Sequence, residues 1–179
     1  MGDNLIEWLE EKNLFTIIKN HVKPFKKVLT KAFDLKKDQE ILIVSDWGDY
    51  GKRVAPLMAG CYCTAAEKLG YQVKTVMQQP KSIKEPAEKH VVDTLSKQKN
   101  KSFIVFSFSN KLGGLSSTIG KSFRRFALQK KHNFLSTTGL GNLENKDIYL
   151  ITRALDLDYN KLQKTGSKIK KILDAGREI

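Results

Sequence analysis

The segment from Asp46 to Arg53, DWGDYGKR, combines two carboxylates, two glycines and two cations directly after an apolar run. Asp46 and Asp49 could hold a divalent metal ion, or they could serve as a pair of acid and base groups. The glycine spacing is G-x-x-G, whereas a dinucleotide-binding turn requires G-x-G-x-x-G, so a dinucleotide cofactor is disfavoured. We favour a structural role, in which Asp46 fixes the turn and Asp49 caps the next helix.

A second glycine-rich segment, GGLSSTIGKS from Gly113 to Ser122, nearly matches a phosphate-binding loop. A Walker A loop has four residues between its first glycine and Gly-Lys-Ser, because that length forms the cradle of amides around the phosphate. Five residues separate Gly114 from Gly120, and no acid follows in the next predicted strand to hold Mg²⁺. Nucleotide hydrolysis is therefore disfavoured. Ser116 also lies too far past the preceding strand to be the nucleophile of a serine hydrolase.

The start of the helix predicted after this loop is a candidate anion site. A helix that begins near Thr118 would present its free amide groups to solvent, and its dipole favours anions. The candidate binding residues there are Ser117, Thr118, Lys121, Arg124 and Arg125. They could hold a carboxylate or a phosphate, but a surface helix whose cations face water is an equally good interpretation.

The residues that most often bind transition metals are few and scattered. Cys61 and Cys63 are two apart in a predicted helix, where their side chains point about 200° apart and cannot form a disulfide bond. We expect both to be buried thiols. His21, His90 and His132 lie far from one another in the sequence. The chain is therefore expected to hold no metal ion or cofactor of its own.

The charge of the chain is strongly positive, with 32 Lys and Arg residues against 19 Asp and Glu residues and a formal net charge of +13. No acid lies between Asp93 and Glu144. A lysine-rich solvated surface is the favoured explanation, because nucleic-acid readers concentrate arginine and aromatic residues at one place. The alternative is a basic α/β module that binds nucleic acid or a phosphorylated ligand at the edge formed by Ser109 to Lys131.

The elements that must position these residues can be read from the apolar pattern. Two helices are predicted first, over Leu5–Glu11 and over Leu14–Phe33, the second with a kink or break at Pro24. Strands and helices then alternate. The predicted strands are Ile41–Val44, Tyr71–Met77, Phe103–Phe108 and Asn133–Thr137, and the predicted helices are Arg53–Leu69, Glu85–Ser96, Ile119–Lys131, Asp147–Leu155 and Tyr159–Ala175.

These lengths suit β-α-β crossovers, which stack helices on both faces of a parallel sheet. We therefore predict an α/β fold: a doubly wound, mostly parallel sheet of about four or five strands, preceded by N-terminal helices. Residues 1–33 form a helical segment that packs on a Rossmann-like domain of residues 34–179. The chain has no run of about eighteen apolar residues, and its first residues are acidic rather than signal-like, so we expect a cytoplasmic protein.

Ligands of such sheets bind outside the carboxyl ends of the strands. The segments expected at that edge are Ser45–Arg53, Gln78–Lys81, Ser109–Thr118 and Thr138–Asn142. If the sheet is parallel, Asp46 and Asp49 would meet Lys121 or Arg124 across a charge-paired cleft.

Three phrases of the sequence, in this order and spacing, resemble a family of metallo-aminopeptidases. They are DLKKDQEILIVSD at Asp34–Asp46, FRRFA at Phe123–Ala127, and RAL followed by DYNKL between Arg153 and Leu162. The chain from about residue 14 to residue 179 is similar to the N-terminal domain of the aminopeptidase T and aminopeptidase S type. It departs from the family at Asp38, where a turn glycine is usual, and in lacking a histidine in the segment Ser117–Gly120.

The resemblance implies an α/β domain that precedes a second domain, in which glutamates, histidines and an aspartate hold two divalent metal ions. That second domain would begin near Glu178, so the chain looks like a fragment without catalytic residues. The whole protein would be a cytoplasmic hydrolase that removes N-terminal residues from peptides. The resemblance also implies a homodimer. The departures leave open a relative that has lost peptidase activity.

Overall fold

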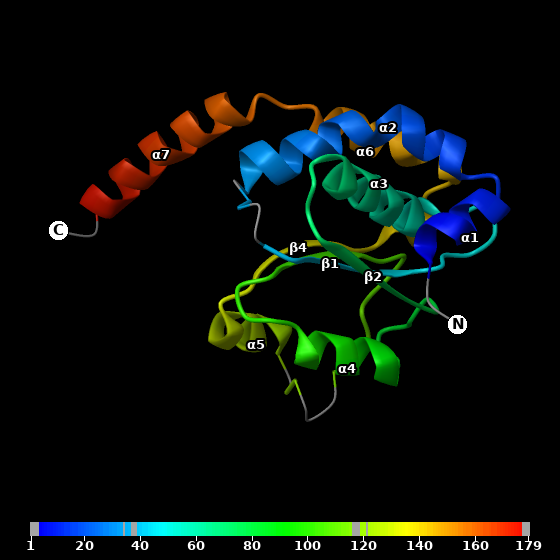
Figure 1. Cartoon of the computed structure of the whole chain (residues 1–179). Coiled ribbons are helices and arrows are strands. Elements are labelled where there is room, and N and C mark those ends of the chain that lie inside the picture. Colours follow the sequence, from blue (N-terminus) through cyan, green and yellow to red (C-terminus); the bar gives the residue numbers. More distant parts are fainter. Residues whose placement is uncertain (1–3, 34, 37–38, 116–118, 121, 177–179) are drawn as a thin grey trace.

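A four-stranded parallel sheet lies at the centre of the computed structural model, which describes residues 4–33, 35–36, 39–115, 119–120 and 122–176 (Figure 1). The strands are β1 (Ile41–Asp46), β2 (Val73–Gln78), β3 (Phe103–Ser107) and β4 (Asn133–Thr137). Their order is β2-β1-β3-β4, and every neighbouring pair is parallel. The predicted doubly wound α/β fold is confirmed, with four strands in the described part of the chain.

The sheet is buried on both faces because its two central strands are apolar at every position of their first four residues. On one face Ile41, Ile43, Phe103 and Val105 join a core with α3 (Val54–Lys68). On the other face the alternate residues of the same strands join a core beneath α4 (Lys89–Lys97) and α5 (Phe123–Lys130). An unbroken apolar run is what a strand buried on both faces requires.

Helix α3 is enclosed on all sides, and 13 of its 15 residues are buried. The sheet lies below it, α2 (Phe15–Lys27) and α6 (Ile148–Leu155) lie above it, and α1 (Leu5–Glu11) lies at its side (Figure 1). Gly60 allows this close approach, because a Cβ atom there would lie 2.5 Å from Ile18 Cδ1. The small side chains of α3 therefore serve two contact surfaces, one toward the sheet and one toward the N-terminal helices.

The predicted break at Pro24 is wrong. Helix α2 runs through Pro24, and the irregularity comes later, as a π-helical turn at Val28–Ala32. Proline removes one helical hydrogen bond, to the carbonyl group four residues before it. That carbonyl belongs to Asn20, an exposed residue of α2.

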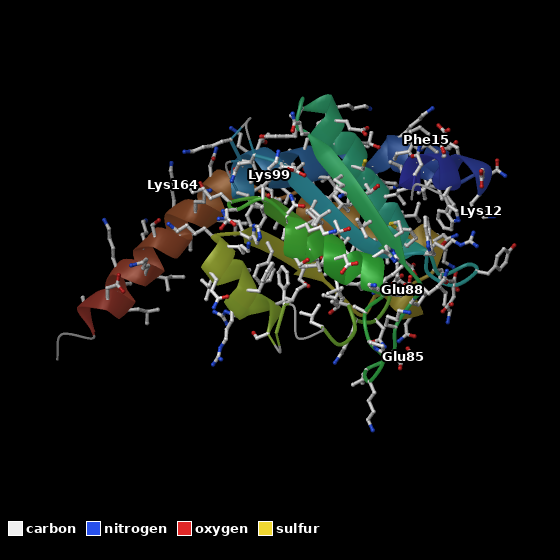
Figure 2. The ribbon with its side chains drawn as sticks, turned by 60° about the horizontal axis from the view of Figure 1, so that its bottom comes forward. Lys12, Phe15, Glu85, Glu88, Lys99 and Lys164 are labelled. Carbon is white, nitrogen blue, oxygen red and sulfur yellow. The ribbon has the colours of Figure 1, made fainter. Side chains whose placement is uncertain are left out.

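Helix α4 begins at Lys89, four residues later than predicted, because the preceding residues pair with another loop. Pro86 forms a parallel bridge with Gly114, and the amide of Ala87 donates to the carbonyl of Gly114 at 2.9 Å. Figure 2 labels Glu85 and Glu88, which lie on either side of this contact. The bridge requires an extended backbone at these residues, and Glu88 is extended as well, so the tertiary contact overrides the local preference for helix.

The final helix, α7 (Tyr159–Ala175), matches its predicted range and has no buried residue. It extends away from the body of the protein, and Lys164 marks its course in the second view (Figures 1 and 2). Leu162, Ile169, Ile172 and Leu173 are 50–72% exposed. We call these four residues the α7 apolar stripe. Within the described residues, no helix is both long and apolar enough to cross a membrane.

His132 lies directly before β4 and is buried beside the ring of Phe126. Neither of its ring nitrogens has a hydrogen-bond partner in the described part of the chain. Burial is the main cause that lowers the pKa of His132, the nearby Lys130 lowers it further, and the backbone of Ser102 opposes part of this change. The folded protein therefore holds a neutral imidazole, whereas the unfolded chain takes up a proton near the ordinary value of 6.5.

The folded state binds this proton more weakly than the unfolded chain does. The contribution of His132 to the free energy of unfolding should therefore be constant above pH 6.5, and the free energy should fall as the pH drops below that value. Urea unfolding at a series of pH values from 7.5 to 5 measures the decrease. The variant His132→Leu should show a smaller decrease over the same range. Parallel pH profiles for the variant and the wild type would contradict a buried neutral His132.

Candidate functional site

The strand order places the point where ligands of such sheets usually bind between β1 and β3. The connection that leaves β1 leads to β2 on one side, and the connection that leaves β3 leads to β4 on the other side. The loops after β1 and β3 therefore diverge from this point. Asp46 ends β1, and Ser109 follows β3 by two residues. The predicted meeting of the Asp46 and Gly113 loops at one edge is therefore confirmed.

Asp46 fills this position with its own side chain, which is fully buried. The amide of Ser109 donates to Asp46 Oδ2 at 2.7 Å, and the Ser109 hydroxyl donates to Oδ1 at 2.6 Å. The amide of Gly48 also donates to Oδ1, at 3.0 Å. Burial raises the pKa of Asp46, and the three donors oppose that change. Asp46 thus fixes the turn, as the favoured structural interpretation predicted.

Further hydrogen bonds surround Asp46 at the carboxyl ends of β1 and β3. Ser45 Oγ donates to the carbonyl of Ser107 at 2.7 Å, and Ser107 Oγ donates to the carbonyl of Ala55 at 2.9 Å. The amide of Gly141 donates to the carbonyl of Ser109 at 2.6 Å. These bonds fasten β1, β3 and α3 together and leave the Asp46 carboxylate committed to the protein's own donors.

The glycines that nearly spelled a phosphate loop serve a contact between two loops. Gly113 has a φ of +96°, and a Cβ atom there would lie 2.7 Å from the amide nitrogen of Ala87. The amide of Gly114 donates to the carbonyl of Glu85 at 2.8 Å. The loop after β3 is thus paired with the loop after β2, and Gly113 provides the close approach that a larger residue would prevent.

Asp49 does not cap α3, and that part of the structural interpretation is wrong. It is exposed, and its carbonyl accepts a hydrogen bond from the amide of Lys52 at 2.9 Å. The N-cap position of α3 is Arg53, whose amide donates to Asn145 Oδ1 at 2.7 Å. The start of α3 has no side-chain cap, and the side chain that bonds to its N-cap residue lies 92 positions later in the chain, which no local pattern could indicate.

Of the predicted contacts of Asp46 and Asp49 with Lys121 or Arg124, the one between Asp46 and Arg124 is not formed: the Asp46 carboxylate is fully buried and accepts its hydrogen bonds from Ser109 and Gly48. Arg124 and Arg125 are exposed on the first turn of α5. Ser117, Thr118 and Lys121 lie outside the described residues.

The predicted helix start near Thr118 is wrong as well. Helix α5 begins at Phe123, and its cap is Ser122, whose Oγ accepts a hydrogen bond from the amide of Arg125 at 3.4 Å. One of the free amides at this terminus is therefore already bonded. Arg124 and Arg125 lie on the first turn of α5, and the anion site that they would form with Ser117, Thr118 and Lys121 stays a prediction.

The basic residues of the acid-free segment lie at both edges of the sheet. Lys111 follows β3 and pairs with Lys81 in a short bridge at the carboxyl edge. The amide of Lys101 donates to the carbonyl of Lys130, which places both residues at the amino edge. Lys99 Nζ lies 3.7 Å from Glu40 Oε2. The basic residues of the acid-free segment are thus divided between the two edges of the sheet and do not form one basic edge.

A hollow of about 250 Å³ lies between α5 and the carboxyl ends of β3 and β4. Five of its eight lining residues are Phe106, Phe108, Leu112, Phe123 and Phe134, and we call this hollow the phenylalanine pocket. The ring of Phe123 meets that of Phe106 edge-on at 4.8 Å and that of Phe134 at 5.3 Å. Sequence reasoning missed the pocket, although it noted Phe106, Phe108 and Phe123 as parts of separate elements.

No group of three or more His, Cys, Asp or Glu residues that could hold a metal ion occurs among the residues that the structure describes. Cys61 and Cys63 are buried, as predicted, and neither forms a disulfide bond. Burial raises the pKa of both thiols, that of Cys63 to about 12, so both are protonated near neutral pH.

Comparison of the chain with protein-family models, with curated proteins and with solved structures finds no match.

Proposed function

We propose that the chain is the non-catalytic N-terminal domain of a cytoplasmic, metal-dependent aminopeptidase of the aminopeptidase T and S type. The observation that carries the proposal is the order in which the three phrases of the resemblance occupy the fold. DLKKDQEILIVSD leads into and forms β1, FRRFA begins α5, and RAL with DYNKL ends α6 and begins α7. These are the positions that the resemblance assigns to them within the family's first domain.

The α7 apolar stripe gives this domain a surface for a second one. Four large apolar side chains lie along the exposed side of a helix that extends from the body, and soluble domains rarely leave such a row uncovered. In the proposed whole protein, α7 packs against the domain that holds the two divalent metal ions. This chain then supports that domain and forms one wall of the path by which the peptide substrate reaches it. The proposal also includes formation of a homodimer.

The proposal predicts a division of activity between the chain and its parent protein. The 179-residue chain should bind no Zn²⁺ or Co²⁺ stoichiometrically and should not hydrolyse leucine p-nitroanilide. The protein encoded by the entire reading frame should hydrolyse that amide and short peptides from the amino end. Its activity should disappear with EDTA and return with Zn²⁺, Co²⁺ or Mn²⁺.

Elemental analysis and a chromogenic assay on both proteins provide the measurement. One or two metal ions per chain together with turnover by the 179 residues alone would overturn the assignment of this chain as non-catalytic. A metal-loaded whole protein that releases no N-terminal residue from any peptide of a mixed library would overturn the aminopeptidase assignment.

A further inference from the structure

The phenylalanine pocket exists because α5 is too short to cover β4. Side chains alternate along a strand, so Phe134, Ser136 and Thr138 share the face that α5 approaches. Phe134 contacts Phe123 at the start of α5, but it is still 37% exposed, and Ser136 and Thr138 are exposed as well. Ser136 and Thr138 line the pocket. The uncovered part of the strand is therefore its carboxyl end.

The walls of the pocket are held in place before any ligand arrives. Phe123 packs edge-on against Phe106 with an interplanar angle of 90° and against Phe134 with an angle of 86°. Phe106 is buried in the sheet, and Phe108 stacks on it at 5.9 Å. Interlocked rings lose little freedom when a ligand binds, so the apolar surface of the pocket favours binding without much rearrangement.

The charge around the pocket selects the kind of occupant. Arg124 is the one charged residue among the eight described residues that line it, and Arg125 follows on the same helical turn. The chain contains no acid from residue 94 to residue 143, which includes every lining residue. A positive potential over an apolar hollow favours a ligand that combines an apolar body with a negative group. The Arg124 guanidinium is a suitable partner for a carboxylate, and the Ser136 and Thr138 hydroxyls can donate to it.

We propose that the phenylalanine pocket binds a small carboxylic acid with an aromatic or branched aliphatic body. The body lies among the rings of Phe106, Phe123 and Phe134, and the carboxylate accepts hydrogen bonds from Arg124. The proposal does not depend on the aminopeptidase assignment, because it rests only on residues of this chain.

The test uses the 179-residue chain with 4-phenylbutyrate and its neutral amide as probes, followed by amide chemical shifts in a two-dimensional NMR titration. We expect saturable binding of the acid, with shifts centred on residues of β4 and the first turn of α5. The amide should bind about tenfold more weakly, which corresponds to the loss of one charge-assisted contact.

Two variants and a matched control locate the site. Arg124→Gln should weaken binding of the acid about tenfold and leave that of the amide unchanged, whereas Arg125→Gln, on the same turn, should change neither by more than about twofold. Ser136→Leu should fill the pocket and abolish both. Ser136→Val serves the same purpose if the leucine variant does not fold.

The proposal would be overturned by equal binding of acid and amide, or by equal losses in Arg124→Gln and Arg125→Gln, which would indicate a general charge effect. No saturable binding of the acid up to about 20 mM would also overturn it. These outcomes leave the aminopeptidase assignment untouched, because that is tested by activity of the whole protein.

Discussion

Replacing Asp46 by alanine is expected to lower the free energy of unfolding by about 3 kcal/mol or more, since the variant leaves three donors without an acceptor. These donors are the Ser109 amide, the Ser109 hydroxyl and the Gly48 amide, and the carboxylate that they meet is fully buried. An unsatisfied buried donor costs about 1–3 kcal/mol, and the vacated space adds a smaller loss of packing.

Asp49→Ala is the matched control, because Asp49 lies in the same loop, carries the same side chain and is exposed. We expect a change within about 0.5 kcal/mol for this variant. Chemical denaturation of the two variants and the wild type measures the difference. Equal stabilities of the two alanine variants would show that Asp46 does not hold β1 and β3 together. The comparison thus distinguishes a structural carboxylate from one kept for binding.

Removing residues 1–33 is expected to abolish cooperative folding of the remaining chain. Helix α3 would lose the cover of α1 and α2, which bury Leu9, Ile18, Val22 and Phe25 in the same core. Phe25 alone meets Tyr62 of α3 edge-on at 4.7 Å, and losing one such buried aromatic side chain costs about 3–5 kcal/mol. The loss of the whole layer exceeds the 5–15 kcal/mol by which domains are typically stable.

The matched control removes α7, by ending the chain after Tyr159. Tyr159 is kept because it packs against the core and its hydroxyl donates to the carbonyl of Leu155. The described part of the removed segment, residues 160–176, is exposed, so the melting temperature should change by only a few degrees, as about 1 kcal/mol allows. Calorimetry and near-ultraviolet circular dichroism give the measurement. A cooperative transition in the chain without residues 1–33 would mean that α3 is stable with one face uncovered.

The sequence by itself determined the architecture, because apolar residues report burial directly. The run from Ile41 to Val44 required a strand covered on both faces, and the small residues of α3 required a helix packed closely. The lengths of the connecting segments then left parallel crossovers as the natural arrangement. The bounds of α1 and α7 were also accurate, and each of these helices begins with a local side-chain cap, Asn4 and Asp158.

Long-range pairing decided where other elements begin. Helix α4 starts late because Pro86 and Ala87 pair with Gly114, and the amide of Arg53 at the start of α3 donates to Asn145 from a distant loop. The role of Asp46 was suggested by its turn, but Ser109, 63 residues away, supplies two of its three donors. A local pattern carries no information about partners this far along the chain.

The candidate sites depended on the tertiary structure for the same reason. The phenylalanine pocket joins β3, β4 and the first turn of α5, and it is open because α5 begins at Phe123 rather than at the predicted Ile119. The pairing of Asp46 with Arg124 failed because burial placed nearer donors around the carboxylate. Sequence periodicity specifies which face of an element is buried, whereas only the packed chain specifies which side chains meet and where a face is left uncovered.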